Sequence, residues 1–79
     1  MKVITTNRTE REIVQTIAFS MGYVWCGTRD RILRNLEDKR WHIYVFNEEK
    51  KTLGRYRTIE TDDMKFEEFI NKMEENLNK

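Results

Sequence analysis

The fold is decided by the stretch Trp41-His42-Ile43-Tyr44-Val45-Phe46. Its β-branched and aromatic residues make it the strongest strand signal in the chain. Side chains alternate along a strand, so one face holds Trp41, Ile43 and Val45 and the other holds His42, Tyr44 and Phe46. The second face is less apolar, and we expect it to be partly covered or to face solvent.

A hairpin is predicted directly after this strand. The polar turn 47–51, Asn-Glu-Glu-Lys-Lys, leads to a further strand-like run from Thr52 to Ile59. Arg55 and Arg57 alternate with smaller or aromatic residues in this run, so one face of the second hairpin strand presents arginines.

An amphipathic helix is predicted before the hairpin. Asn7 is a good N-cap, and Glu10 can reach back to its backbone N–H as in a capping box. Gly22 suits the left-handed position after a helix, so the helix should end near residue 21. The apolar stripe comprises Ile13, Val14, Ile17, Ala18 and Met21, with Arg8, Arg11, Glu12 and Gln15 largely off it.

The remaining patterns complete the predicted fold. Val3-Ile4 and Tyr23-Val24-Trp25 indicate short strands, and a C-terminal helix is predicted by the spacing of Phe66, Phe69, Ile70, Met73 and Leu77. We expect one α+β domain over residues 1–79, with the element order (β)-α-β-β-β-α. Its small sheet should have three to four largely antiparallel strands, with both helices packed on one face.

The segment from Cys26 to Arg40 is longer than a hairpin loop requires. Ile32, Leu33 and Leu36 have weak helical spacing and Thr28 can serve as a cap, so we expect a short accessory helix or a turn. Binding residues concentrate on loops that a rigid scaffold holds. We therefore expect this segment to determine specificity.

Basic residues of this segment and the neighbouring strand form the candidate partner-binding set. Guanidinium groups bind phosphates and carboxylates through paired hydrogen bonds, and aromatic rings beside them suit RNA, a nucleotide or an acidic protein surface. Acidic residues interleave with the set, so a locally salt-bridged surface is the alternative interpretation. The set comprises Arg29, Arg31, Arg34, Lys39, Arg40, Arg55, Arg57 and Tyr56.

The composition disfavours catalysis. His42 and Cys26 are the only histidine and the only cysteine, which leaves a single conceivable nucleophile and base pair and no Cys- or His-based metal cluster. The glutamates of the second helix predict a solvated face rather than a catalytic pair or a Mg²⁺ site: Glu67, Glu68, Glu74 and Glu75. We expect no enzymatic activity, no metal and no cofactor.

The two tryptophans, Trp25 and Trp41, are expected to be core anchors. Each buries about 200 Å², and few other residues in so short a chain can replace that area. A tryptophan that proved exposed would instead become the leading candidate for a binding hot spot.

Charge is distributed unevenly along the chain. Residues 1–59 carry twelve Lys or Arg against seven Asp or Glu, net +5, whereas residues 60–79 carry three against seven, net −4. This polarity can orient the chain toward an acidic partner. No apolar run reaches the roughly 18 to 20 residues that span a bilayer, so we expect a cytoplasmic protein with no membrane partner.

Four segments carry a family resemblance: Phe19-Ser20-Met21-Gly22-Tyr23-Val24-Trp25-Cys26, Ile43-Tyr44-Val45, Lys51-Thr52-Leu53 and Met64-Lys65-Phe66-Glu67-Glu68-Phe69. They resemble small accessory proteins of tailed bacteriophages, of the host-takeover or anti-defence type. The resemblance implies a short chain made in the cytoplasm of an infected bacterium, where it binds a host enzyme, a defence component or a signalling nucleotide.

We therefore expect a non-catalytic binding protein, a phage-encoded inhibitor or modulator of a host or defence protein. The first alternative is a nucleic-acid or nucleotide-binding module that uses the same arginines and aromatic residues. Another is a homo-oligomer in which an exposed strand edge pairs with a second copy.

Overall fold

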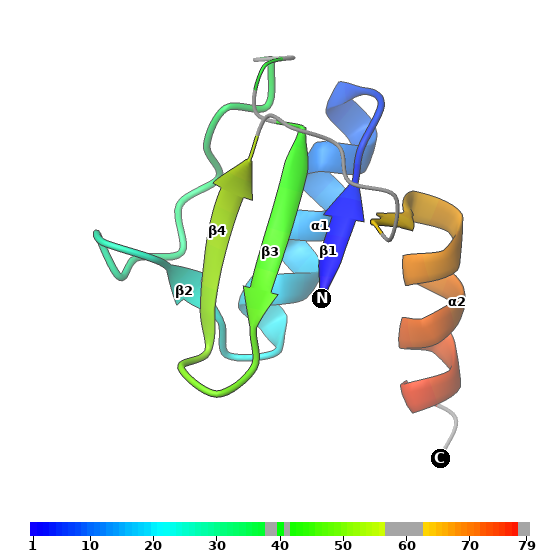
Figure 1. The fold of residues 1–79 in the computed structure, drawn as a ribbon. Coiled ribbons are helices and arrows are strands. Elements are labelled where there is room, and N and C mark those ends of the chain that lie inside the picture. Colours follow the sequence, from blue (N-terminus) through cyan, green and yellow to red (C-terminus); the bar gives the residue numbers. More distant parts are fainter. Residues whose placement is uncertain (38–39, 41, 57–62, 78–79) are drawn as a thin grey trace.

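The computed structural model describes residues 1–37, 40, 42–56 and 63–77. Figure 1 shows a sheet with one helix behind it and a second helix beside its edge. The elements are β1 (Lys2–Ile4), α1 (Arg8–Ser20), β2 (Val24–Trp25), β3 (Ile43–Asn47), β4 (Thr52–Tyr56), β5 (Met64–Lys65) and α2 (Phe66–Leu77). The predicted α+β class, with two helices, is confirmed.

The sheet has five strands within the described residues, in the order β2-β4-β3-β1-β5. β3 pairs antiparallel with β4, as the hairpin pattern predicts, and it also pairs antiparallel with β1. The two edge strands instead run parallel to their neighbours, β2 to β4 and β5 to β1. The sheet is therefore mixed and wider than the predicted three to four largely antiparallel strands. β5 has only two residues, too few to show an alternating pattern in the sequence.

The face of β3 that carries Tyr44 and Phe46 was expected to be partly covered or to face solvent, and this expectation was wrong. Ile43, on the other face, is fully buried as well. Tyr44 and Phe46 are buried and belong to the hydrophobic core that packs on α1, so Ile43 and Val45 face the other side of the sheet. The aromatic face can enter the core because its groups find partners there. The ring of Phe46 meets the rings of Tyr23 and Phe69 at centroid distances of 5.2 and 5.5 Å, and the Tyr44 hydroxyl accepts a hydrogen bond from Gln15.

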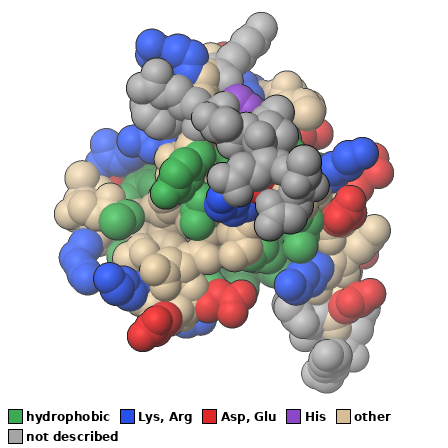
Figure 2. Space-filling model, in the orientation of Figure 1, with side chains coloured by type: hydrophobic (Ala, Val, Ile, Leu, Met, Phe, Trp, Pro, Cys, Tyr) green, Lys and Arg blue, Asp and Glu red, His purple; other side chains and the backbone are tan. Residues whose placement is uncertain are grey.

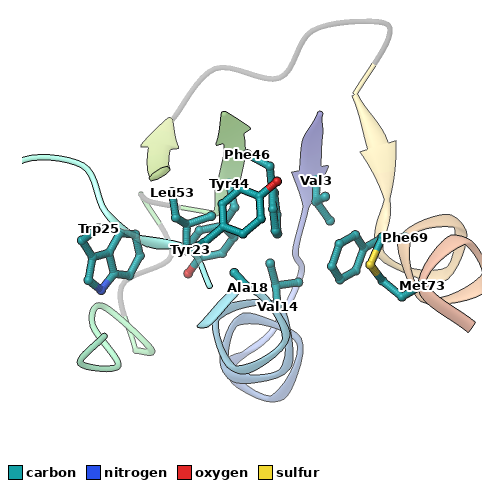
Figure 3. Close-up of a cluster of buried hydrophobic side chains, with 10 residues drawn as sticks. All are labelled: Val3, Val14, Ala18, Tyr23, Trp25, Tyr44, Phe46, Leu53, Phe69 and Met73. Atoms are coloured by element: carbon teal, nitrogen blue, oxygen red, sulfur yellow. The ribbon is translucent and has the colours of Figure 1, made fainter. Parts of the chain in front are cut away.

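Both helices contribute side chains to this core on the same side of the strands, as Figure 3 shows. Val14 and Ala18 of α1 lie beneath the strands, and Phe69 and Met73 of α2 approach from the β5 edge. The expected arrangement, with both helices packed on one face, is matched only in part, because α1 lies behind the sheet and α2 lies beside its edge (Figure 1). α2 packs against β1 and β5 rather than across the whole sheet.

The ends of α1 follow the predicted caps with one difference. Asn7 Oδ1 accepts a hydrogen bond from the Glu10 N–H at 2.9 Å, but the Glu10 carboxylate bonds the N–H of Thr6, also at 2.9 Å, rather than that of Asn7. At the other end Gly22 has a φ of +91°, and the Tyr23 N–H reaches the Ala18 carbonyl at 3.0 Å. This is the Schellman arrangement that a glycine favours.

Trp25 is only 3% exposed, which confirms it as a core anchor; Trp41 lies outside the described residues. The second hairpin strand was expected to reach Ile59, and the part from residue 57 onward is likewise not described. Within the described ranges, neither helix has the length and apolar character that crossing a membrane requires.

Candidate functional site

Residues 26–37, here the 26–37 loop, run along the side of the molecule next to β2 and β4 (Figure 1). The described chain has neither helix nor strand over these residues, so the predicted accessory helix was wrong and the alternative of a turn was right. Arg29 and Asn35 adopt left-handed backbone angles, with φ of 59° and 56°, which a continuous helix cannot accommodate. Backbone bonds from Arg29 N to Trp25 O and from Trp25 N to Asp30 O, both 2.9 Å, close a turn instead.

Gln15 on α1 anchors the loop from the inside. Its side chain is fully buried, and its Oε1 accepts a hydrogen bond from the Arg34 N–H at 2.9 Å. Its Nε2 donates to the Arg34 carbonyl at 2.7 Å and to the Tyr44 hydroxyl at 2.9 Å. One amide side chain thereby satisfies both backbone groups of a loop residue, much as a neighbouring strand would.

Two further side chains hold the loop in the same way. Arg11 is buried on α1 and donates from Nε to the Leu36 carbonyl at 2.7 Å. The Trp25 indole donates from Nε1 to the Ile32 carbonyl, also at 2.7 Å. Donors on α1 and β2 thus bond the carbonyls of alternate loop residues, Ile32, Arg34 and Leu36, in place of the backbone bonds that a helix would supply. The loop is irregular, but its backbone is fixed at three places.

The prediction that Arg11 and Gln15 lie off the buried stripe of α1 was therefore wrong. The buried residues of the helix are Arg11, Val14, Gln15 and Ala18, at the spacing i, i+3, i+4 and i+7. That spacing is visible in the sequence. Because two of the four positions are polar, a search for apolar residues alone selects a stripe centred on Ile13 and Ile17, which are only partly buried.

The fixed loop presents apolar and basic side chains to solvent. Ile32 is 59% exposed and Leu33 is 39% exposed. Arg29 and Arg31 are exposed as well, and within the described part of the chain neither forms an ion pair. The interpretation as a salt-bridged surface holds for other members of the segment, because Arg34 pairs with Asp30 and Glu37 pairs with Arg8.

A pocket of about 350 Å³ adjoins the loop, lined by Trp25, Cys26, Thr28, Arg34, Leu53, Gly54 and Arg55. The guanidinium carbon of Arg55 lies 5.3 Å from the centroid of the Trp25 ring, within cation–π range. On the other wall, Arg34 Nη2 bonds Asp30 Oδ2 at 2.7 Å. This hydrogen bond holds the pKa of Asp30 below its usual value, so the carboxylate stays charged beside the pocket.

The structure brings only part of the predicted basic set together. Arg34 and Arg55 meet at the pocket, whereas Arg29 and Arg31 project from the loop and Arg40 is exposed beyond it.

The predicted residue Tyr56 lies apart from the pocket. It is 53% exposed and, by alternation, lies on the opposite sheet face from Arg55. The Lys2 ammonium is 5.6 Å from the centroid of the Tyr56 ring. Lys39 and Arg57 fall outside the described residues.

The residues considered for catalysis are not assembled. Cys26 is exposed, and its N–H donates to the Leu53 carbonyl of β4 on the side that faces β2. His42 directly precedes β3, which lies on the opposite side of β4. β2 and β3 are two strand spacings apart, and His42 lies three positions along β3 from the level of Cys26, so their backbones are separated by more than about 10 Å. The glutamates of α2 are exposed, as predicted: Glu67, Glu68, Glu74 and Glu75. In the described ranges no three His, Cys, Asp or Glu side chains are grouped as a metal would require.

Figure 2 shows how charge is arranged on the sheet side of the molecule. Lys and Arg side chains recur along the left margin, where the loop lies in Figure 1, and acidic side chains lie mainly at the hairpin end and on the right. Within the loop, the exposed basic residues Arg29 and Arg31 adjoin the exposed apolar residues Ile32 and Leu33 in the sequence. Comparisons with protein-family models, with curated proteins and with solved structures found no match.

Proposed function

We propose that this chain is a non-catalytic protein-binding module and that the 26–37 loop forms its binding surface. One observation carries the proposal. Buried side chains hold the loop backbone from the inside, at Ile32, Arg34 and Leu36, while Ile32 and Leu33 extend into solvent. An ordered loop loses little conformational entropy when it binds, so its exposed apolar side chains can contribute most of their burial energy to affinity.

The charges beside this apolar tip favour a particular kind of partner surface. Arg29 and Arg31 form no ion pair in the described structure, so their guanidinium groups are available to carboxylates of another protein. Arginine and large apolar side chains are also the usual centres of binding energy at interfaces. The partner should therefore offer an apolar depression bordered by acidic residues.

The resemblance to accessory proteins of tailed bacteriophages supports a further part of the proposal. The partner is then a host enzyme or a defence component in the cytoplasm of an infected bacterium, and binding inhibits or modulates it. An inhibitor needs no catalytic centre of its own, because occupying a functional surface of the target is enough.

Affinity capture from bacterial lysate tests the loop directly. The lysate is treated with nuclease, and retained proteins are quantified for the wild type, for Ile32→Ser with Leu33→Ser, and for Met21→Ser. Met21 is a matched control, since it is 41% exposed but lies outside the loop. We expect one set of proteins to be retained by the wild type and the control and lost from the double variant. Equal retention by all three would contradict the assignment to the loop.

Nucleic-acid or nucleotide binding is the second candidate, favoured by the two guanidinium groups at the pocket. The Trp25 ring is 3% exposed and its face is occupied by Arg55, so it offers no platform on which a base could stack. A phosphate-driven interaction would weaken steeply with added salt. Retention that disappears after nuclease treatment, or that falls by orders of magnitude between low and physiological salt, would support this candidate instead.

Self-association through a strand edge has less support. The edge strands of the described sheet, β2 and β5, have two residues each and offer few backbone groups to a second copy. Sedimentation at high protein concentration decides the matter. A monomer excludes edge pairing, whereas a dimer would support self-association.

A further inference from the structure

We propose that the pocket beside the 26–37 loop receives one carboxylate, the side chain of a Glu or Asp of the bound partner, between Arg34 and Arg55. This inference rests on the proposed function and adds the chemistry by which the partner is recognised. The pocket and the loop are continuous, because Cys26, Thr28 and Arg34 belong to both. A protein that covers Ile32 and Leu33 therefore also reaches the pocket mouth.

Arg34 is held in place but keeps hydrogen-bonding capacity. Gln15 fixes its backbone, and Asp30 fixes its guanidinium through Nη2 at 2.7 Å. A guanidinium group carries five N–H donors. Its Nε is buried and has no hydrogen-bond partner among the described residues, but the side chain as a whole is 38% exposed, so other N–H groups of the guanidinium can reach a ligand. A carboxylate that enters the pocket can bond the same guanidinium without displacing the contacts that hold it.

Arg55 forms the facing wall. Its guanidinium lies over the Trp25 ring, and Trp25 is itself fixed by its bond to the Ile32 carbonyl. Leu53 and the Trp25 ring add apolar surface that suits the methylene groups of an acidic side chain, and Thr28 adds a hydroxyl. A volume of about 350 Å³ admits a single side chain with room to spare.

The charge around the pocket favours a carboxylate over a phosphate. Asp30 sits directly behind Arg34 and offsets part of its charge. Arg34 and Arg55 carry +2 and Asp30 carries −1, so the three groups have a net charge of +1, which one carboxylate neutralises and a doubly charged phosphate exceeds. Asp30 thereby sets the charge of the pocket while it positions Arg34.

A titration followed by two-dimensional NMR of the ¹⁵N-labelled protein tests the pocket without the partner. The probes are N-acetylglutamate N-methylamide, its uncharged glutamine counterpart, and inorganic phosphate at about pH 7.5, where phosphate is mostly doubly charged. The reporters are the Trp25 indole N–H and the Nε–H groups of Arg34 and Arg55. We expect saturable shifts of these signals with the glutamate probe only.

Two substitutions should change the affinity for the glutamate probe in opposite directions. Arg34→Gln removes the guanidinium but keeps the backbone bonds to Gln15, and should weaken binding by at least about fivefold. Asp30→Asn removes the competing carboxylate, and should strengthen binding of the glutamate probe and allow phosphate to bind. Lys72→Gln, which removes an exposed positive charge from α2 away from both the loop and the pocket, is the control and should change nothing.

The outcomes separate this inference from the proposed function. Absence of saturable shifts, or shifts that Arg34→Gln leaves unchanged, would overturn the pocket assignment even if loop-dependent capture of a protein succeeded. Tighter binding of phosphate than of the glutamate probe by the wild type would also overturn it, in favour of nucleotide or nucleic-acid recognition. Failure of the loop variants in the capture experiment would instead contradict the proposed function.

Discussion

At the scale of single residues, the most consequential side chain is a buried glutamine. Gln15 links α1, β3 and the 26–37 loop through three hydrogen bonds, and no solvent reaches it. Burying an amide is costly unless its donors and acceptor are satisfied, and here Arg34 and Tyr44 satisfy them. Desolvation by burial in turn raises the pKa of Tyr44, which keeps its hydroxyl neutral as an acceptor for Gln15.

Gln15→Leu should destabilise the protein and loosen the loop. The substitution leaves the N–H and carbonyl of Arg34 and the Tyr44 hydroxyl without their partner, at a cost of about 1–3 kcal/mol in the free energy of unfolding. Urea denaturation measures the cost, and hydrogen exchange of the Arg34 amide reports the loop. Thr16→Leu, at the neighbouring exposed position of α1, is the control and should leave both quantities nearly unchanged.

The Asp30 carboxyl should titrate below the usual range of aspartate, because Arg34 hydrogen-bonds its charged form. A pKa lowered in the folded state contributes stability above the unfolded pKa, and this contribution disappears as the pH falls through the folded value. Carbon-13 NMR of the carboxyl group measures the titration. Arg34→Gln should raise the pKa of Asp30, whereas Arg31→Gln should not; an equal pKa in all three proteins would contradict the pairing.

At the scale of elements, the predictable parts were those with a local pattern. The cap at Asn7, the glycine after α1 and the periodicity of α2 each follow from residues within a few positions of one another. The face of β3 was not predictable in this way, because Tyr44 is buried only where Gln15, 29 positions away, meets its hydroxyl. The loop conformation likewise depends on distant donors on α1 and β2.

The candidate site was predictable in composition but not in geometry. The sequence identified the arginine-rich segment and Arg55 as candidates. The parallel pairing of β2 with β4 then places Trp25 beside Leu53. This pairing brings Arg34 and Arg55 to one pocket. A two-residue parallel pairing leaves no pattern in the sequence, because parallel strands are joined by long connections rather than by a turn.

The cap of α1 provides a test at this scale. Asn7→Ala removes the acceptor for the Glu10 N–H and should lower the free energy of unfolding by about 1 kcal/mol. Thermal denaturation followed by circular dichroism measures the loss. Thr9→Ala, two positions further along and exposed, is the control; a loss no larger than that of the control would show that Asn7 does not cap the helix in solution.

At the scale of the whole molecule, one thin core must hold two helices and five described strands. A domain of 79 residues typically has a stability of about 4–12 kcal/mol. α2 joins the core through Phe69 and Met73, and the rings of Phe69 and Phe46 lie 5.5 Å apart. The docking of this helix therefore accounts for a large share of the total stability.

Phe69→Ala should cost about 3–5 kcal/mol in the free energy of unfolding, because it removes a fully buried ring and leaves a cavity between α2 and the sheet. Urea denaturation should show a midpoint far below that of the wild type, or a protein already partly unfolded in buffer. Lys72→Ala, on the exposed side of the same helix, is the control. A loss below about 1 kcal/mol would show that α2 is not an integral part of the core.

The central claim is that the 26–37 loop is ordered before it meets a partner, and ¹⁵N relaxation of the free protein measures this most directly. We predict order parameters for the amides of Arg29 to Leu36 close to those of α1, about 0.85, and a clear decrease at these residues in Gln15→Leu. Order parameters below about 0.6 across the loop of the wild type would contradict the claim.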